Sequence, residues 1–528
     1  MNHTFEVDLK PEEAFDETTF KQTIFQRLKA DPAEVYLHPL RRSIDARGGN
    51  VIVKFLVELV PVGAQQPPNQ NRDYTNLTPS APRVIIVGAG PAGLFAALRL
   101  IELGVKPVII ERGKDVQARR RDIAAINKEH IVNPESNYCF GEGGAGTYSD
   151  GKLYTRSKKR GDIKRILEIL VAHGAKEEIR YDAHPHIGTN KLPQVVQQLR
   201  ESILHAGGEI HFNTRVTDFI LKNGEMKGVK TGLGDTVEGE SVILATGHSA
   251  RDIFLLLQKN NIHIEAKPFA LGIRVEHSQN LIDKIQYHCP IDRGEYLPAS
   301  SYSLVHQAKS EGKERGVFSF CMCPGGFIVP SATTPGEIVV NGMSPSRRDS
   351  KFANSGIVVA VEAVDFKEYE KQGALAGMYF QEAVERKACM VAGGTQKAPA
   401  QRLMDFLENR NSSTLTDSSY QPGLASVDMR EVLPKFVYEA LQQGFRNFGL
   451  KMKGYLTNEA QVVGVESRTS SPIKTPRDKE TFEHSQIKRL FPCGEGAGYA
   501  GGIVSAAMDG ERCAEAVVKM YLKFEVKA

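Results

Sequence analysis

One segment near residue 83 constrains the fold of this chain more than any other. A short apolar run at 84–87 is followed by Gly88-Ala-Gly90-Pro-Ala-Gly93 and then by an apolar stretch with helical spacing at 94–103. A second apolar run, 108–110, ends at Glu111. Strand, glycine turn, helix and strand form a βαβ unit, which predicts a parallel, doubly wound sheet of the Rossmann type.

The three glycines of this turn have separate physical roles. Gly88 permits the tight turn, Gly90 lets the main chain approach a pyrophosphate, and Gly93 lets the helix pack against the strand. The helix N-terminus then directs N–H groups toward the phosphates, and Glu111 can accept hydrogen bonds from a ribose. A carboxylate repels a 2′-phosphate, so the expected cofactor is FAD or NAD rather than NADP. The alternative, an ordinary tight βα turn, explains less of the pattern. The predicted cofactor site also includes Pro91, Ala92 and Arg112.

Composition excludes several classes of protein. The 528 residues are 41% hydrophobic and 25% charged, which is typical of a soluble globular chain and suggests about three domains. A net charge of +4 gives no general attraction to nucleic acid or anionic lipid. No apolar run reaches the ~18 residues of a membrane helix. Seven cysteines without a CxxC motif, and no export-type leader, favour reduced thiols in the cytoplasm.

The chain divides into segments of different character. Residues 1–60 predict a small α+β domain, with a helix at 18–30 and strands at 34–45 and 51–60. Nine Lys and Arg against eleven Asp and Glu over residues 1–78 argue against a nucleic-acid-binding arm. Proline, Asn and Gln make 61–82 a linker. The remaining segments are the first part of the nucleotide-binding domain at 83–264, an inserted α+β substrate or cap domain at 265–450, and the closing part of the nucleotide-binding domain at 451–528.

Later motifs resemble the FAD superfamily of the glutathione-reductase type. A strand ending in Ala245-Thr246-Gly247, a preceding NTRVTDF segment, and Gly494-Glu495 followed by Gly501-Gly502-Ile503 occur in the order that this superfamily has. The resemblance implies that Val216 meets adenine and that Glu495 binds the ribityl or pyrophosphate part of FAD. It also implies that the helix after Gly502 points at the pyrimidine side of the flavin. A glycine-rich loop with no preceding strand is expected to wrap the flavin pyrophosphate rather than to be a flexible surface loop. Its predicted cofactor residues are Gly143, Gly144, Ala145, Gly146 and Asp150.

Longer phrases resemble a narrower bacterial family of FAD-dependent proteins, described as uncharacterised or as NAD/FAD-utilising dehydrogenases. The phrases are FGEGGAGTYSDGKL (140–153), KPFALGIRVEH (267–277), FCMCPGG (320–326), VNGMSPSRRDSKFANS (340–355), VESRTSSP (465–472) and GEGAGYAGGI (494–503). The resemblance implies the fold and bound FAD. It implies no particular substrate.

Several residues are candidates for chemistry beside the flavin. His248, His277 and Arg274 could handle protons, although a single histidine is more often structural. Cys321 and Cys323 form a CxC on a predicted strand, where alternation places both thiols on one face. There are two interpretations: a dithiol that exchanges electrons with flavin, or two small buried residues. The second interpretation is favoured, because free cysteine is commonly buried. No metal site is expected, because a structural metal usually needs four ligands.

Arginines in the family-like phrases could bind an anionic substrate, although solvated surface is the favoured interpretation. They are Arg347, Arg348, Arg468 and Arg477. The sequence therefore predicts an FAD-dependent oxidoreductase, with NAD(P)H as a transient reductant and a small molecule or electron carrier as substrate. The alternatives are a flavoprotein that modifies or binds nucleic acid, and a thiol redox sensor. The catalytic residues and the oligomeric state stay open.

Overall fold

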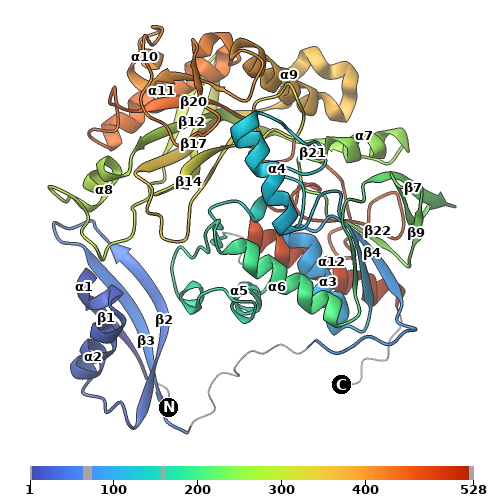
Figure 1. The fold of residues 1–528 in the computed structure, drawn as a ribbon, viewed down its shortest axis with the longest axis horizontal. Coiled ribbons are helices and arrows are strands. Elements are labelled where there is room, and N and C mark those ends of the chain that lie inside the picture. The colour runs from blue at the N-terminus through green and yellow to red at the C-terminus, as the bar shows by residue number, and fades with distance from the viewer. Residues whose placement is uncertain (1–2, 64–73, 156–160, 523–528) are drawn as a thin grey trace.

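The structure is a computed structural model that describes residues 3–63, 74–155 and 161–522. Three bodies are visible in Figure 1: a small N-terminal unit, a nucleotide-binding domain around β4 and α3, and a cap domain around β12 and β17. No helix among the described residues is both long enough and apolar enough to cross a membrane.

The N-terminal unit is a helical hairpin on a three-stranded antiparallel sheet of order β1-β3-β2. Phe20 and Ile24 on α2 pack against Phe55 of β3 in its core. The sequence predicted the longer helix and two strands but not the first strand. The elements are β1 (His3–Leu9), α1 (Pro11–Phe15), α2 (Glu17–Leu28), β2 (Val35–Asp45) and β3 (Ile52–Pro61).

The predicted linker is partly attached to the nucleotide-binding domain. Residues 64–73 lie outside the described residues. Beyond them, the Leu77 N–H donates to the Ala206 carbonyl, and Tyr74 and Leu77 pack against the core of that domain. The last part of the linker therefore lies against the folded domain.

The nucleotide-binding domain contains the predicted parallel sheet, in the order β22-β10-β4-β5-β6. Its strands read as short apolar runs because helices cover them. Helices α3 and α12 pack closely because Gly510 has no side chain. A Cβ at this position would overlap the Ala92 carbonyl oxygen. The elements are β4 (Arg83–Val87), α3 (Pro91–Glu102), β5 (Lys106–Ile110), β6 (Glu209–His211), β10 (Val242–Leu244), β22 (Leu490–Pro492) and α12 (Ile503–Tyr521).

Between these strands the chain adds helices and a small antiparallel sheet of order β7-β8-β9. Figure 1 shows α4, α5 and α6 on the side that faces the cap and the N-terminal unit. The elements are α4 (Val116–Glu129), η1 (Gly144–Gly146), α5 (Ile163–Ala172), η2 (Glu177–Arg180), α6 (Leu192–His205), β7 (Val216–Lys222), β8 (Glu225–Thr231), β9 (Thr236–Glu238) and α7 (Arg251–Lys259).

The cap domain is built on a seven-stranded sheet of order β13-β14-β17-β12-β20-β18-β19. The predicted boundary at residue 450 is wrong in one respect, because β20 (Gln461–Glu466) pairs with β12 and β18 inside this sheet. Its partner β12 lies almost two hundred residues earlier, so no local pattern assigns β20 to the cap. The other strands of this sheet are β12 (Phe269–Ser278), β13 (Val305–Ser310), β14 (Lys313–Cys323), β17 (Phe352–Val361), β18 (Ala398–Arg402) and β19 (Leu424–Ser426).

The remaining cap elements cover this sheet and link it to the nucleotide-binding domain. Helices α9 and α11 contribute apolar side chains to the core beside this sheet. The elements are β11 (Glu265–Ala266), α8 (Gln279–Tyr287), β15 (Phe327–Pro330), β16 (Val340–Met343), η3 (Ala363–Leu375), α9 (Ala376–Val391), α10 (Leu403–Leu407), η4 (Met429–Glu431), α11 (Lys435–Lys451) and β21 (Ile473–Lys474).

Candidate functional site

A cavity of about 400 Å³ lies between the carboxyl edge of the parallel sheet and the cap. Ligands of open α/β sheets bind at this edge. All predicted cofactor residues except Gly93 and Gly143 line the cavity. Those two glycines support the wall from behind. A Cβ on Gly93 would overlap the Gly88 carbonyl oxygen, and a Cβ on Gly143 would overlap the Thr147 hydroxyl.

The open space in front of the glycines fits an extended dinucleotide. Apart from the adjacent residues, no atom of the protein lies within 4 Å of a Cβ built on Gly90, Gly501 or Gly502, so protein packing does not require glycine there. By contrast, Gly88 has φ +105°, and a Cβ there would lie 2.5 Å from the Ala245 carbonyl oxygen. The first group of glycines leaves room for a ligand to reach the main chain. Helices α3 and α12 both begin at this cavity, so their N-terminal N–H groups favour negative charge.

Glu111 holds three loops of the cavity wall together. Its carboxylate accepts main-chain hydrogen bonds from Ala89 (2.8 Å), Gly113 (2.9 Å) and Gly141 (3.0 Å). The sequence predicted a contact with ribose but not this structural role. Because a carboxylate offers about four acceptor positions, three internal bonds leave capacity for a ligand hydroxyl.

Arg119 holds the glycine-rich loop in place. Its guanidinium is fully buried and donates to the carbonyls of Asn137, Tyr138, Glu142 and Gly144. Four carbonyl partners compensate the loss of hydration of this cation. This role of Arg119 could not be predicted from the sequence, because an arginine in a charged helix gives no sign that it is buried.

The cap contributes a chemically different wall. Phe320 and Cys321 come from β14, Asn341 comes from β16, and Arg468 and Thr469 follow β20. A register shift interrupts the pairing of β14 with β17 between Phe320 and Cys323, and Cys321 has φ +45°. The irregular end of this strand therefore forms part of the cavity wall.

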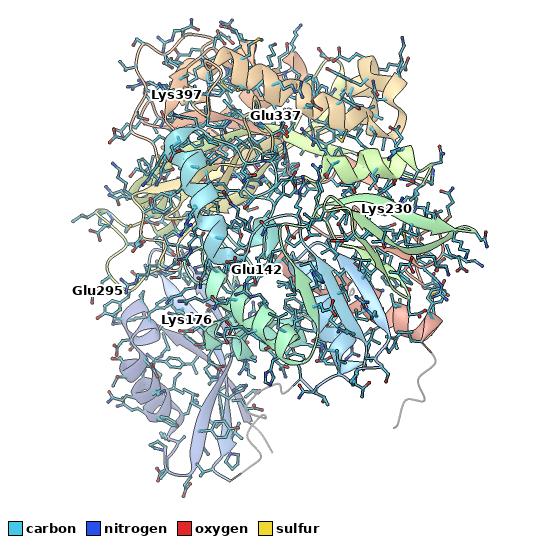
Figure 2. All side chains as sticks on the ribbon, turned by 45° about the vertical axis from the view of Figure 1, so that its right-hand side comes forward. Glu142, Lys176, Lys230, Glu295, Glu337 and Lys397 are labelled. Atoms are coloured by element: carbon cyan, nitrogen blue, oxygen red, sulfur yellow. The ribbon has the colours of Figure 1, made fainter. Side chains whose placement is uncertain are left out.

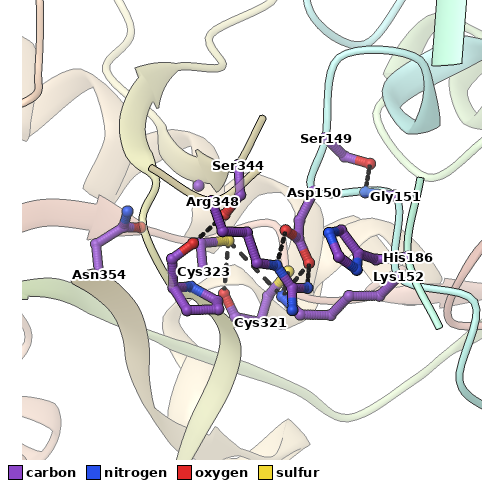
Figure 3. A network of polar contacts seen from close by, with 12 residues as sticks. Ser149, Asp150, Gly151, Lys152, His186, Cys321, Cys323, Ser344, Arg348 and Asn354 are labelled. Atoms are coloured by element: carbon purple, nitrogen blue, oxygen red, sulfur yellow. Dashed lines mark hydrogen bonds and ion pairs between the residues drawn. The ribbon is translucent and has the colours of Figure 1, made fainter. Parts of the chain in front are cut away.

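A cluster of charges and thiols lies where the two walls meet (Figure 3). Lys152 Nζ lies 3.7 Å from the sulfur of Cys321, 3.7 Å from the sulfur of Cys323 and 3.4 Å from Asp150 Oδ2. Asp150 also pairs with Arg348 at 2.7 Å. A hydrogen bond from Cys323, with the positive charges of Lys152 and Arg274, holds the pKa of Cys321 well below its usual value, although burial opposes the shift. Lys152 had not been singled out from the sequence.

His248 and Glu495 form a second polar group on the cavity wall. Their nearest atoms, Nε2 and Oε2, are 3.7 Å apart. Burial, aided by the nearby cations Arg468, Lys267 and Arg251, lowers the pKa of His248 to about 4, so the ring is neutral at pH 7. Burial raises the pKa of Glu495 to about 7. Glu495 is therefore the group of this pair that can hold a proton near neutral pH.

The structure does not bring His277 or Arg274 to the cavity. His277 Nε2 bonds to the Tyr455 carbonyl at 2.8 Å within the cap core, and burial lowers the pKa of His277 to about 4. Arg274 is fully buried and pairs with Glu466 at 2.5 Å. It also donates to the Cys321 carbonyl at 2.7 Å, so it supports the cavity wall from behind.

The surface interpretation of the arginines is wrong for three of the four. Arg348 binds the buried Asp150, Arg468 binds Glu337 and Glu385, and Arg477 binds Asp509. Each of these guanidiniums is mostly buried and is paired with at least one carboxylate. Arg347 is exposed. Figure 2 shows Glu337 in the cap near α9.

An arginine contacts a candidate set of metal ligands. Cys493, Asp509 and Cys513 place one ligand atom each within 4.8 Å of the others. Arg477 donates to Asp509 Oδ1 at 2.6 Å and to the Cys513 sulfur at 3.4 Å. The guanidinium already supplies positive charge, which opposes the binding of a further cation there.

Three family models match consecutive parts of the chain. Residues 1–60 match a domain of unknown function, residues 82–253 match the pyridine nucleotide-disulphide oxidoreductase family, and residues 268–469 match the C-terminal domain-like family of FAD-dependent proteins. An uncharacterized protein of Clostridium beijerinckii is 42% identical over 441 residues, which cover 83% of this chain and 81% of that protein. The chain belongs to the family of this Clostridium protein. Its cofactor is FAD, as the family models and the open glycine cradle agree.

More distant relatives share parts of the chain or its general fold. A thiamine thiazole synthase of Aeropyrum pernix is 29% identical over 182 residues, which cover 32% of this chain and 55% of that enzyme. The structure of a flavin-dependent brominase is 13% identical with a TM-score of 0.36, covering 85% of this chain and 81% of that one. A flavocytochrome c3 fumarate reductase is 12% identical with a TM-score of 0.34, covering 84% and 79%.

Proposed function

We propose that this protein is an FAD-dependent oxidoreductase that acts on a small molecule or an electron carrier at the cap side of the cavity. One observation carries the proposal: a single cavity has a glycine-rich wall of main-chain groups and, opposite it, a wall of cap side chains that includes Cys321, Asn341 and Arg468. FAD supplies two-electron transfer chemistry when it is bound. The residues of the chain hold the cofactor, position the substrate and provide proton-handling groups.

The residues of the glycine-rich wall suggest how the cofactor lies. Glu111 and the N-terminus of α3 would hold the ribose and the pyrophosphate, and Val216 would lie beside adenine. The N-terminus of α12, behind Gly501 and Gly502, would stabilise negative charge on the reduced ring. Glu495 would hold or release a proton near neutral pH. We assign the domain to the glutathione-reductase type of FAD fold on the order of these elements.

The reductant in this proposal is NAD(P)H that binds transiently. Among the described residues, one βαβ unit has the complete glycine turn with its acidic partner, and FAD occupies it. The seven free cysteines suit a reducing compartment, and we propose the cytoplasm.

The visible absorption spectrum of the purified protein, recorded without oxygen before and after NADH or NADPH, tests this function. We expect a bound-flavin spectrum that loses its visible bands after one of the two nucleotides is added. A protein that shows no flavin, even after incubation with FAD, would contradict the proposal. Flavin that stays oxidised with both nucleotides would show that neither NADH nor NADPH is the reductant. The substrate itself would then reduce the flavin.

A further inference from the structure

Two thiols and one ammonium group meet at the cap side of the flavin cavity. Cys321 lines the cavity, and Cys323 lies directly behind it with no exposed surface. Both sulfurs lie 3.7 Å from Lys152 Nζ, and Cys323 donates a hydrogen bond to the Cys321 carbonyl at 3.2 Å. Figure 3 shows the two side chains and the Lys152 side chain converging on one point.

We propose that Cys321 and Cys323 are a redox-active dithiol that exchanges two electrons with the bound flavin, with Lys152 as the cation that stabilises the Cys321 thiolate. The inference rests on the proposed FAD site. In the forward direction the Cys321 thiolate and the Cys323 thiol form one S–S bond. The electron pair and the thiol proton go to the oxidised flavin, giving the reduced anionic flavin. The reverse direction reduces the disulfide, and no further reactant is needed for either step.

The irregular main chain brings the two thiols together. Cys321 has φ +45°, so the regular strand separation of roughly 6.6 Å between residues i and i+2 does not apply here, and a hydrogen bond joins the two side chains. The pairing of β14 with β17 is already interrupted here, so forming the bond would not require the loss of a regular ladder. Cys321, on the cavity wall, is placed to meet the flavin or a substrate. Cys323 is placed to close the disulfide.

The charges around Cys321 favour a thiolate there. Lys152 and Arg274 supply positive charge, and Asp150 partly opposes them. The nearby carboxyl groups of Glu466 and Glu495 have pKa values raised to about 7, mainly by burial, so their negative charge is reduced below neutral pH. The thiolate is the nucleophilic form of cysteine, and adjacent cations are the usual means of stabilising it.

The second thiol pair of the chain has no access to the flavin cavity. Cys493 and Cys513 are fully buried, neither lines the cavity, and Arg477 contacts the Cys513 sulfur at 3.4 Å. It therefore provides a matched control. The proposed pair also lies in the cap domain, whereas the flavin disulfide reductases that this superfamily contains carry their pair soon after the first FAD motif. Here only Cys139 lies in that region.

Reductive titration of the air-oxidised holoprotein with dithionite, without oxygen, tests the proposal. We expect wild-type protein to accept four electrons per FAD, Cys321→Ser and Cys323→Ser to accept two, and Cys513→Ser to accept four. Mass spectrometry of alkylated protein gives a separate readout: the oxidised form should contain a Cys321–Cys323 bond, and the reduced form should carry a label on both residues.

Two results would overturn the proposal while leaving the FAD site intact. One is full flavin content with two electrons per FAD in the wild-type protein. The other is a four-electron capacity that Cys321→Ser retains and Cys513→Ser loses. Failure to bind flavin at all would instead count against the proposed function. The flavin spectrum of each variant therefore separates the two failures.

Lys152→Met tests the role of the cation. Loss of the ammonium group raises the pKa of Cys321, so less thiolate is present at any pH below that value. We expect alkylation of Cys321 in reduced holoprotein to slow by at least about tenfold at fixed pH, corresponding to one pKa unit. The exposed Lys309→Met serves as the control and should match wild type. An unchanged pH profile in Lys152→Met would contradict the assigned role.

Discussion

The two walls of the flavin cavity are built on different principles. The nucleotide-binding wall uses main-chain N–H groups, glycines with open space before them, and one carboxylate that holds its loops. The cap wall uses side chains: a phenylalanine, a thiol, an asparagine, an arginine and a threonine from three separate segments. Main-chain groups can bind the parts of FAD that stay the same whatever the substrate. The side chains of the cap wall can instead differ from one substrate to another. Cofactor binding and reaction specificity are therefore separable in this molecule by mutation.

The largest effect is expected from a bulky residue at Gly90. A valine there has no protein atom within 4 Å of its Cβ, so the fold is kept, but the side chain enters the space proposed for the pyrophosphate. We expect FAD affinity to fall by far more than tenfold, with an unchanged far-ultraviolet circular dichroism spectrum. Gly93→Val is the companion variant. Its Cβ would overlap the Gly88 carbonyl oxygen, so it should lose the folded domain as well. Full flavin content in Gly90→Val would contradict the main-chain character of this wall.

Arg274→Met should weaken the cap without emptying the flavin site. The variant leaves Glu466 buried without its cation, a change that typically costs about 3–5 kcal/mol. Burial already raises the pKa of Glu466 to about 7, and loss of Arg274 raises it further. Protonated Glu466 is neutral and needs no cation beside it. The free energy of unfolding of the variant therefore falls as the pH rises through the pKa of Glu466. Denaturant unfolding at pH 6 and pH 8 should show the larger loss at pH 8.

The double variant Arg274→Met/Glu466→Met serves as the control for this pair. It removes both charges and should recover most of the stability at pH 8. If Arg274→Met lost its flavin as completely as Gly90→Val, the two walls could not be treated as separable.

Glu111→Gln should have an intermediate effect on the nucleotide-binding wall. The amide group of Gln brings its own donors to a position where three main-chain N–H groups need acceptors. Hydrogen bonds to a charged partner contribute about 1.5–3 kcal/mol, so we expect a loss of about 2 kcal/mol in unfolding free energy, with a lower flavin content. Glu209→Gln, on the adjacent strand and partly exposed, is the control and should stay within about 0.5 kcal/mol of wild type.

The smallest effect should come from the contact between the N-terminal unit and the nucleotide-binding domain, which belongs to neither wall. Arg42 makes two hydrogen bonds to Asp182, at 2.5 and 2.8 Å, and both side chains are partly exposed. We expect Arg42→Ala to cost about 1 kcal/mol and to leave the flavin content unchanged. A double-mutant cycle with Asp182→Ala measures the coupling. Additive effects of the two changes would show that the ion pair does not hold the unit in place.

The sequence predicted the nucleotide-binding wall far better than the cap wall. The turn at Gly88–Gly93 and the helix after Gly502 were predicted because strand, glycine and helix signals are local. The Lys152 cluster was missed because Lys152 and Cys321 are 169 positions apart, and only the folded chain brings them together. Burial of Arg119, Arg468 and Arg477 was missed for the same reason. Each has its compensating carbonyls or carboxylates on another segment, so its charge alone suggested a surface position.

The sheet order of the nucleotide-binding domain has a consequence for the synthesis of the chain. Its edge strand β22 and the helix α12 are made last, after the complete cap sheet between residues 269 and 466. Domains generally fold as units while the chain emerges from the ribosome, so the cap can fold before β10 has its second neighbour, β22, and before α12 packs against α3. Both ends of this interrupted domain line the flavin cavity, so the cavity is complete only after release of the α12 segment. Completion of the cofactor cavity is thus a late step, and a chain interrupted within the cap would leave β10 without its outer neighbour β22 and α3 without α12.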